Sequence, residues 1–181
     1  MILEQFGNFS DDEVQLFNRN LRYKHLSKDE TLSKEGEISR SIFFIIKGSF
    51  YKQYNDDQRD EEIITDLFLE NEWVFDHESL VTQLPATAII KAFEQSEVLE
   101  LTLDSLHHLI RESQKFLQFN KLLSTEAKMS YFDRNMNPAE KYSHLLKTKP
   151  RLIQTFPLTM IASYLKIRPE TLSRVRSNVT I

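Results

Sequence analysis

The side chains with the most informative spacing lie between residues 157 and 176. Thr159 can cap a helix, and apolar residues follow it at helical spacing. A three-residue turn, 166–168, separates this helix from a second one that starts at Pro169, a favoured first-turn residue. Leu172 would lie on the buried side of the second helix, which leaves basic and hydrogen-bonding side chains outward. This pattern is typical of a helix-turn-helix, whose second helix contacts base edges in the major groove of DNA.

The predicted helix-turn-helix lies in the basic part of an unevenly charged chain. The formal net charge is −4, yet residues 134–181 have a net charge of +7 and residues 1–133 a net charge of −11. A basic segment beside an acidic body indicates two domains, the second of which meets a polyanion. The alternative is an ordinary helical hairpin with uneven surface charge. We favour DNA binding, because the charge and the helical pattern coincide.

The residue types that several other chemistries need are missing or badly spaced. The chain has no cysteine, which excludes disulfides, thiolate zinc sites and a cysteine nucleophile. His107 and His108 are adjacent and therefore point to different faces of a helix, a poor spacing for a metal site. The sequence has no glycine-rich phosphate loop, Ser-His-Asp order or paired-carboxylate signature. We expect a protein that is not an enzyme, with no predicted metal or cofactor.

The hydropathy of the chain predicts no membrane segment. Its longest strongly apolar run, 42–46, is far shorter than the roughly 20 residues that a spanning helix needs. Residues 1–10 contain neither the basic nor the apolar part of an export signal. We therefore expect a cytoplasmic protein without a membrane partner.

Short apolar runs between residues 25 and 103 predict an antiparallel β-roll. They are rich in Ile, Val, Phe and Tyr and are separated by polar turns. Many short strands of this kind favour a rolled antiparallel sheet over alternating strands and helices. A short helix at 11–23 precedes them, since Ser10 can cap it and apolar residues recur at helical spacing. We assign residues 1–103 to this first domain.

Residues 104–136 predict one long amphipathic helix after the last strand. Asp104 can cap it, no glycine or proline interrupts it, and one apolar face repeats every three to four residues. Such a helix packs on its own domain or pairs with the helix of a second chain. We expect a homodimer, with residues 137–181 as the DNA-binding domain that follows. The predicted dimer interface consists of Phe116, Phe119, Leu123 and Ala127.

The order of these elements resembles the Crp/Fnr family of transcription regulators. The resemblance implies an α+β fold with a jelly-roll-like antiparallel β-roll of the cyclic-nucleotide-binding type, a long dimerisation helix and a winged helix-turn-helix. Three motifs support it: Ile161-Ala162-Ser163-Tyr164-Leu165 with Pro169-Glu170-Thr171-Leu172-Ser173-Arg174, then Gly36-Glu37, and Phe43-Phe44-Ile45-Ile46-Lys47-Gly48.

The same resemblance assigns roles to the side chains of the helix-turn-helix. It implies that Glu170 and Arg174 read bases, while Thr159 and Thr171 hold phosphates. It also implies RNA polymerase as a protein partner if the chain is an activator. The residues expected to contact double-stranded DNA are Thr159, Lys166, Arg168, Pro169, Glu170, Thr171, Ser173, Arg174 and Arg176.

The resemblance also implies an effector pocket in the roll, where this chain departs from the cyclic-nucleotide pattern. In that pattern a Gly-Glu pair holds the ribose, and an Arg-Ser/Thr pair holds the cyclic phosphate. Here Glu72 matches, and Asn71 replaces the glycine, which Asn's tolerance of the left-handed conformation allows. Ala86 replaces the arginine, so no nearby cation would neutralise a buried phosphate.

We therefore expect an unknown effector, or none, rather than cyclic AMP. The predicted pocket residues are Asn71, Glu72, Trp73, Ala86 and Thr87. The alternative function is a sensor module of the cyclic-nucleotide type whose C-terminal helices bind a protein partner. Salt-dependent retention on DNA would separate the two functions.

Overall fold

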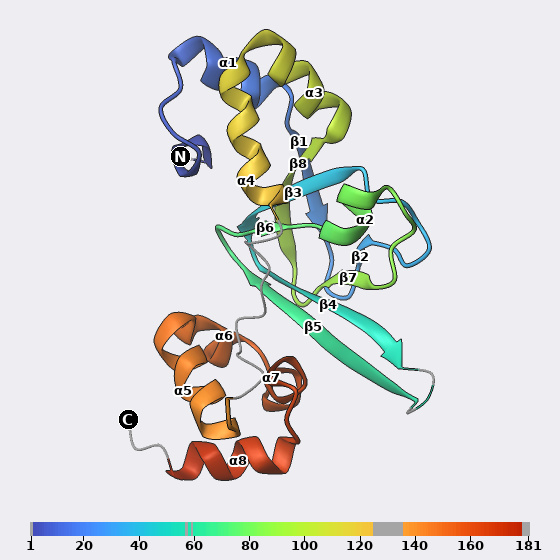
Figure 1. Cartoon of the computed structure of the whole chain (residues 1–181), viewed down its shortest axis with the longest axis vertical. Coiled ribbons are helices and arrows are strands. Elements are labelled where there is room, and N and C mark those ends of the chain that lie inside the picture. Colours follow the sequence, from blue (N-terminus) through green and yellow to red (C-terminus); the bar gives the residue numbers. More distant parts are fainter. Residues whose placement is uncertain (1, 57, 59, 125–135, 179–181) are drawn as a thin grey trace.

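The computed structural model describes residues 2–56, 58, 60–124 and 136–178, in which a β-rich body precedes a helical C-terminal part (Figure 1). Within these residues, strands form two four-stranded antiparallel sheets with the orders β1-β8-β3-β6 and β2-β7-β4-β5. The prediction of an α+β fold with an antiparallel roll is confirmed. The strands are β1 (Arg22–Leu26), β2 (Thr31–Ser33), β3 (Ser41–Lys47), β4 (Ser49–Asp56), β5 (Glu61–Leu69), β6 (Trp73–Val74), β7 (Ile89–Ala92) and β8 (Ser96–Thr102).

Strand β3 contributes to two apolar cores because successive side chains of a strand point to opposite faces. Phe43 and Ile45 join the cluster between the two sheets, whereas Ile42 and Phe44 join a cluster that includes the N-terminal helices. This double burial explains why the strand is apolar without interruption. Gly48, which follows it, has φ +93°, and a Cβ there would collide with Ser96. The β3–β4 turn therefore requires glycine at this position.

A layer of helices packs on the sheet that contains β3 and β8 (Figure 1). The first helix starts as predicted, with a capping box between Ser10 and Glu13. The backbone N–H of Ser10, the Ser113 hydroxyl and the Lys115 ammonium hold the pKa of the Glu13 carboxyl at about 2. The layer consists of η1 (Ile2–Gln5), α1 (Asp11–Arg19), α3 (Leu103–Glu112), η2 (Gln114–Phe119) and α4 (Asn120–Leu123).

The prediction of one continuous helix over 104–136 is wrong for the part of it that the structure describes. Helix α3 is capped by Thr102 and ends at Ser113. The backbone of Ser113 is extended, with φ −148° and ψ 125°. The Ser113 hydroxyl donates to Glu13 and accepts from the N–H of Lys115, so it stabilises a break in the helix. Residues 125–135, which include Ala127, lie outside the described residues.

The break at Ser113 turns two predicted dimer-interface residues into the core of their own chain. The side chains of Phe116 and Phe119 are 0% and 1% exposed. Phe116 packs against Phe9 and Phe17, and Phe119 stacks on Phe6 with 4.1 Å between ring centroids. In this arrangement a second chain cannot reach either ring. Leu123 is partly buried against the same cluster.

Residues 136–178 fold into helices, the first of which begins after Asn137. Asn137 caps this helix and Pro138 occupies its first turn. The structure contains no strand in this part of the chain, so the expected wing is not among the residues described. The helices are α5 (Pro138–Thr148), α6 (Pro150–Thr155), α7 (Leu158–Leu165) and α8 (Pro169–Asn178).

Candidate functional site

Helices α7 and α8 form a tightly packed pair joined by a short turn. Lys166 ends α7 in the left-handed conformation with φ 56°, and its N–H donates to the carbonyl oxygen of Ser163 (2.9 Å). The next N–H, of Ile167, donates to Ala162 (3.0 Å), which completes a Schellman-type helix end. Ala162 and Leu172 are fully buried. Both belong to one apolar cluster, and the small side chain of Ala162 lets neighbouring helices approach closely.

All nine predicted DNA-contacting residues lie at the surface of this pair. Seven of the nine are exposed, Arg176 among them, whereas Pro169 and Thr171 are half-buried at the start of α8. Glu170 and Arg174 are four residues apart on α8 and therefore on one face of it. The exposed residues besides Arg176 are Thr159, Lys166, Arg168, Glu170, Ser173 and Arg174.

The role of Thr159 as a helix cap is wrong. Helix α7 begins at Leu158, after Pro157, and no side chain caps it. Thr159 therefore lies in the first turn of α7 with an exposed side chain, and its hydroxyl is not needed for a cap. The other end of α7 is supported by Lys141, whose ammonium donates to the carbonyl oxygen of Leu165 (3.1 Å).

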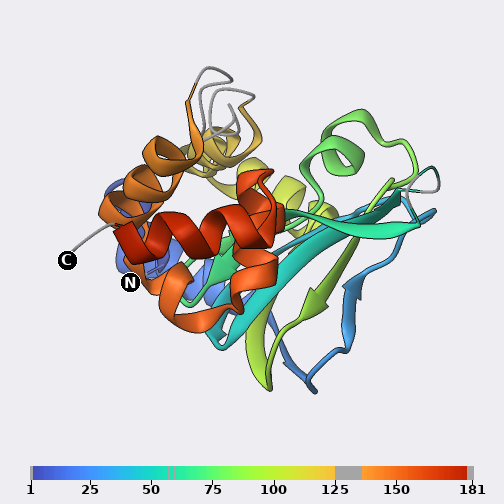
Figure 2. The same cartoon turned by 90° about the horizontal axis from the view of Figure 1, so that it is seen from below.

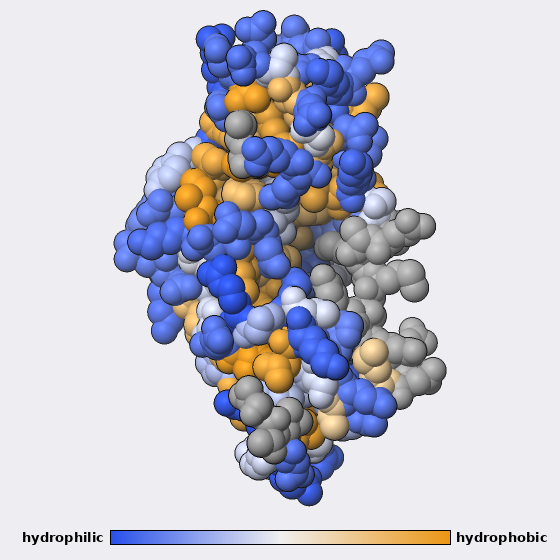
Figure 3. Space-filling model, turned by 90° about the vertical axis from the view of Figure 1, so that its left-hand side faces the viewer, coloured by the Kyte–Doolittle hydropathy of each residue, from blue (hydrophilic) through white to orange (hydrophobic). Residues whose placement is uncertain are grey.

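Helix α8 forms the outer edge of the C-terminal part. Figure 2, seen from below, shows it in front of the other C-terminal helices, and Figure 1 shows it at the lower end of the molecule. That end is mainly hydrophilic in the side view of Figure 3. This arrangement leaves the polar face of α8 accessible to a large ligand.

The five predicted pocket residues do not come together in one site. Asn71 is exposed in the β5–β6 turn with φ 70°, the left-handed conformation expected of a residue that replaces glycine. Trp73 packs against Phe6 and Phe119 in the helical layer. Ala86 is buried beside the turn at residues 36–37, where its N–H donates to Glu37 and its carbonyl oxygen accepts from Gly36. Thr87 is exposed.

Glu72 contacts the C-terminal part of the chain. One carboxylate oxygen accepts from the N–H of Leu69 (3.0 Å), and the other lies 2.9 Å from the ammonium of Lys149. Lys149 is the residue before α6. The carboxylate is therefore held in place by its own turn and directed at a residue 77 positions later.

Asp76 is an acidic residue buried inside the roll that was not predicted from the sequence. Its side chain caps α2 (His77–Thr82), accepting from the N–H of Ser79 (2.9 Å). Its second oxygen lies 2.7 Å from the ammonium of Lys52 on β4, and the two side chains are 2% and 14% exposed. An aspartate directly before a short helix is a cap signal that could have identified it. Its lysine partner is 24 residues away, and only the fold reveals the pairing.

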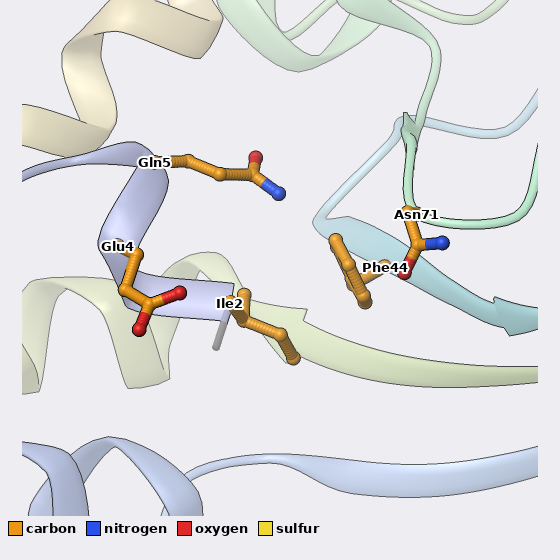
Figure 4. A pocket seen from close by; sticks show the side chains of 5 residues that line it. All are labelled: Ile2, Glu4, Gln5, Phe44 and Asn71. Carbon is orange, nitrogen blue, oxygen red and sulfur yellow. The ribbon is translucent and has the colours of Figure 1, made fainter.

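An open groove of about 540 Å³ lies between the N-terminal η1 and the roll. Figure 4 shows Ile2, Glu4 and Gln5 on one side of it and Phe44 and Asn71 on the other. Of the predicted pocket residues, Asn71 alone lines this groove. The groove is thus distinct from the buried Lys52–Asp76 pair.

Comparisons with known proteins agree with both parts of this architecture. Residues 23–113 match the family described as "Cyclic nucleotide-binding domain". The "Anaerobic regulatory protein" of Haemophilus influenzae is 30% identical over 178 residues, which cover 89% of this chain and 68% of that protein. The chain belongs to the Crp/Fnr family of transcription regulators. This family consists of regulators and not of enzymes.

Solved structures of Crp/Fnr-type proteins share the fold over most of their length. The catabolite activator protein of Thermus thermophilus has a TM-score of 0.58 at 19% identity, covering 96% of this chain and 84% of its own. FixK2 of Bradyrhizobium japonicum has a TM-score of 0.63 at 17% identity, covering 87% and 83%. At these identities the likeness concerns the fold alone.

No group of three or more His, Asp or Glu side chains in residues 2–56, 58, 60–124 and 136–178 is arranged to hold a metal ion. No helix in the same residues is both long and apolar enough to cross a bilayer.

Proposed function

We propose that this Crp/Fnr protein is a sequence-specific DNA-binding regulator that uses α8 to read bases in the major groove. The observation that supports this most directly is the exposed polar face of α8, where Glu170, Ser173 and Arg174 stand clear of the protein core. An arginine can donate two hydrogen bonds to guanine O6 and N7, and a glutamate can accept from cytosine N4. Side chains of these types on one helix face suit a G·C base pair.

The remaining polar residues of the pair suit the sugar-phosphate backbone. Lys166 and Arg168 are exposed in the turn, and Thr159 is exposed in the first turn of α7. Basic and hydroxyl side chains at these positions fix the orientation of a helix-turn-helix without reading sequence. Thr171, half-buried at the start of α8, completes the proposed phosphate contacts.

The proposed active form is a homodimer on a roughly two-fold symmetric site. A dimer places two recognition helices about one helical turn of DNA apart. RNA polymerase is the proposed further partner if the regulator is an activator. The proposal is tested by selecting bound sequences from a random DNA pool with the purified protein. Selection of a palindromic motif supports it, whereas the absence of any enriched motif contradicts it.

Replacing Arg174 by Ala should remove the preference for one base pair in each half-site, because a bidentate arginine–guanine contact is worth about 1–3 kcal/mol of discrimination. Lys166→Ala should instead weaken binding to all DNA sequences alike, and it should reduce the slope of log affinity against log salt concentration by about one per chain. Mobility-shift titrations over a range of salt concentrations measure both effects. If Lys166→Ala changes base preference and Arg174→Ala does not, the proposed roles are wrong.

Cyclic AMP should bind weakly or not at all, with a dissociation constant no tighter than roughly millimolar, because no arginine is available for its phosphate. The half-buried Lys52 does not replace that arginine, since its ammonium is already paired with Asp76. Isothermal titration calorimetry measures this directly. A micromolar dissociation constant would contradict the proposal that the roll takes no cyclic nucleotide.

A further inference from the structure

Strand β5 and the C-terminal helices share one apolar core. β5 is the edge strand of its sheet, with β4 on one side and α7 and α6 packed on it (Figures 1 and 2). Ile64, Leu67 and Leu69 of β5 are buried in the same cluster as the helix-turn-helix core. Helix α7 is buried toward both neighbours, at Ile161, Ala162, Tyr164 and Leu165. The first helix of the helix-turn-helix thus covers a sheet edge of the sensor domain.

Two polar contacts accompany this apolar packing. The N–H of Ile64 donates to the hydroxyl of Ser163 on α7 (2.9 Å). The ammonium of Lys149 lies 2.9 Å from the carboxylate of Glu72, with side chains 22% and 31% exposed. We call these two contacts, together with the packing of β5 on α7, the interdomain contact. The hydrogen bond is directional and the ion pair lies at the start of α6. Together they constrain the rotation of the C-terminal helices relative to β5 as well as their distance from it.

The interdomain contact leaves the proposed DNA-reading face uncovered. Ser163 lies on α7, whereas Glu170, Ser173 and Arg174 are exposed on α8. A docked helix-turn-helix is therefore free to meet DNA, and the contact does not block α8. Fixing a binding element in one orientation lowers the entropic cost of engaging a ligand.

We infer that Glu72 and Lys149 are positioning residues, which hold the helix-turn-helix on β5 so that the two recognition helices of a dimer have a fixed separation. This inference rests on the proposed DNA-binding function. It assigns Glu72 a role in orienting the DNA-binding domain instead of holding an effector. A fixed separation favours one half-site spacing, whereas a tethered but undocked domain tolerates several.

The test measures the affinity of the full chain for three kinds of DNA. These are an operator with the correct half-site spacing, operators with one or two base pairs added between the half-sites, and a single half-site. Lys149→Gln and Glu72→Gln should each weaken binding to the correctly spaced operator by about three- to tenfold, as two partly exposed ion pairs are lost per dimer. Both variants should make the affinity depend less on half-site spacing and should leave the affinity for a single half-site unchanged. The double variant should be no weaker than either single one. Lys149→Arg, which keeps the charge, should retain most of the affinity.

Matched controls separate this role from a general loss of charge. Lys147→Gln removes the same charge from an exposed residue of α5, and Glu70→Gln removes one from the turn that contains Glu72. Neither should flatten the spacing dependence. If Lys149→Gln weakens the single half-site as much as the full operator, or adds to the effect of Glu72→Gln, then Lys149 contacts phosphates and the inference is overturned.

A second measurement does not depend on DNA. Hydrogen exchange of the Ile64 amide, followed by NMR, should be several-fold faster in Glu72→Gln and Lys149→Gln, because the bond to Ser163 opens more often. The amide of Phe50, deep in the roll, should be unaffected. Unchanged exchange at Ile64 would overturn the inference even if DNA binding is normal. Faster exchange in a protein that binds no DNA would instead mean that the proposed function fails and the docking holds.

Discussion

Replacing Lys52 by Met should lower the free energy of unfolding by about 3–5 kcal/mol, the usual cost of removing one partner from a buried ion pair. Lys52 and Asp76 lie 2.7 Å apart, and the aspartate side chain is 2% exposed. Methionine keeps much of the volume of the lysine side chain, so the loss arises mainly from the uncompensated carboxylate. Urea unfolding, followed by circular dichroism, measures the change in free energy.

Two variants test whether the charge of Asp76 causes this loss. Lys52→Met/Asp76→Asn should recover much of the stability, because the buried charge is gone and the amide oxygen can still accept from Ser79. Lys47→Met, at the exposed end of β3, should change stability by less than about 0.5 kcal/mol. If Lys52→Met is as stable as Lys47→Met, the ion pair does not stabilise the roll.

Phe119→Ala should destabilise the chain by about 3–5 kcal/mol, as expected for a large aromatic side chain lost from a packed core. Phe119 contacts Phe6, Phe17 and Trp73, three rings from separate segments of the chain. The apolar area removed from water at this position is therefore intrachain area. The midpoint of urea unfolding should fall by the same amount at low and at high protein concentration.

The same variant discriminates between core packing and the dimer interface that the sequence suggested for Phe119. Sedimentation velocity of Phe119→Ala under native conditions should give the same molecular mass as the unmodified protein. Leu117→Ala, two residues away and 43% exposed, is the matched control and should have almost no effect on stability. A clean shift of Phe119→Ala from dimer to stable monomer would restore the original assignment.

Local patterns in the sequence were sufficient for the elements whose structure depends on near neighbours. The cap at Ser10 and the short turn before Pro169 were both predicted, because each is stabilised within four residues. The turn at Gly48 was also recognised as part of the family resemblance. The β-roll followed from the recurrence of short apolar runs, since the strands of two packed sheets bury short apolar segments between polar turns.

The sequence by itself therefore determined the β-roll, the helices that begin after Ser10 and at Pro169, the basic C-terminal part and the polar face of α8. Only the tertiary structure decided what those elements face. The helix over 104–136 breaks at Ser113 because Glu13, 100 residues earlier, bonds its hydroxyl. Glu72 faces Lys149 because β5 docks on α7, and Asp76 faces Lys52 because the fold brings the cap of α2 beside β4. Such partners are distant in the chain, and their contact energies depend on a three-dimensional packing that local propensity does not encode.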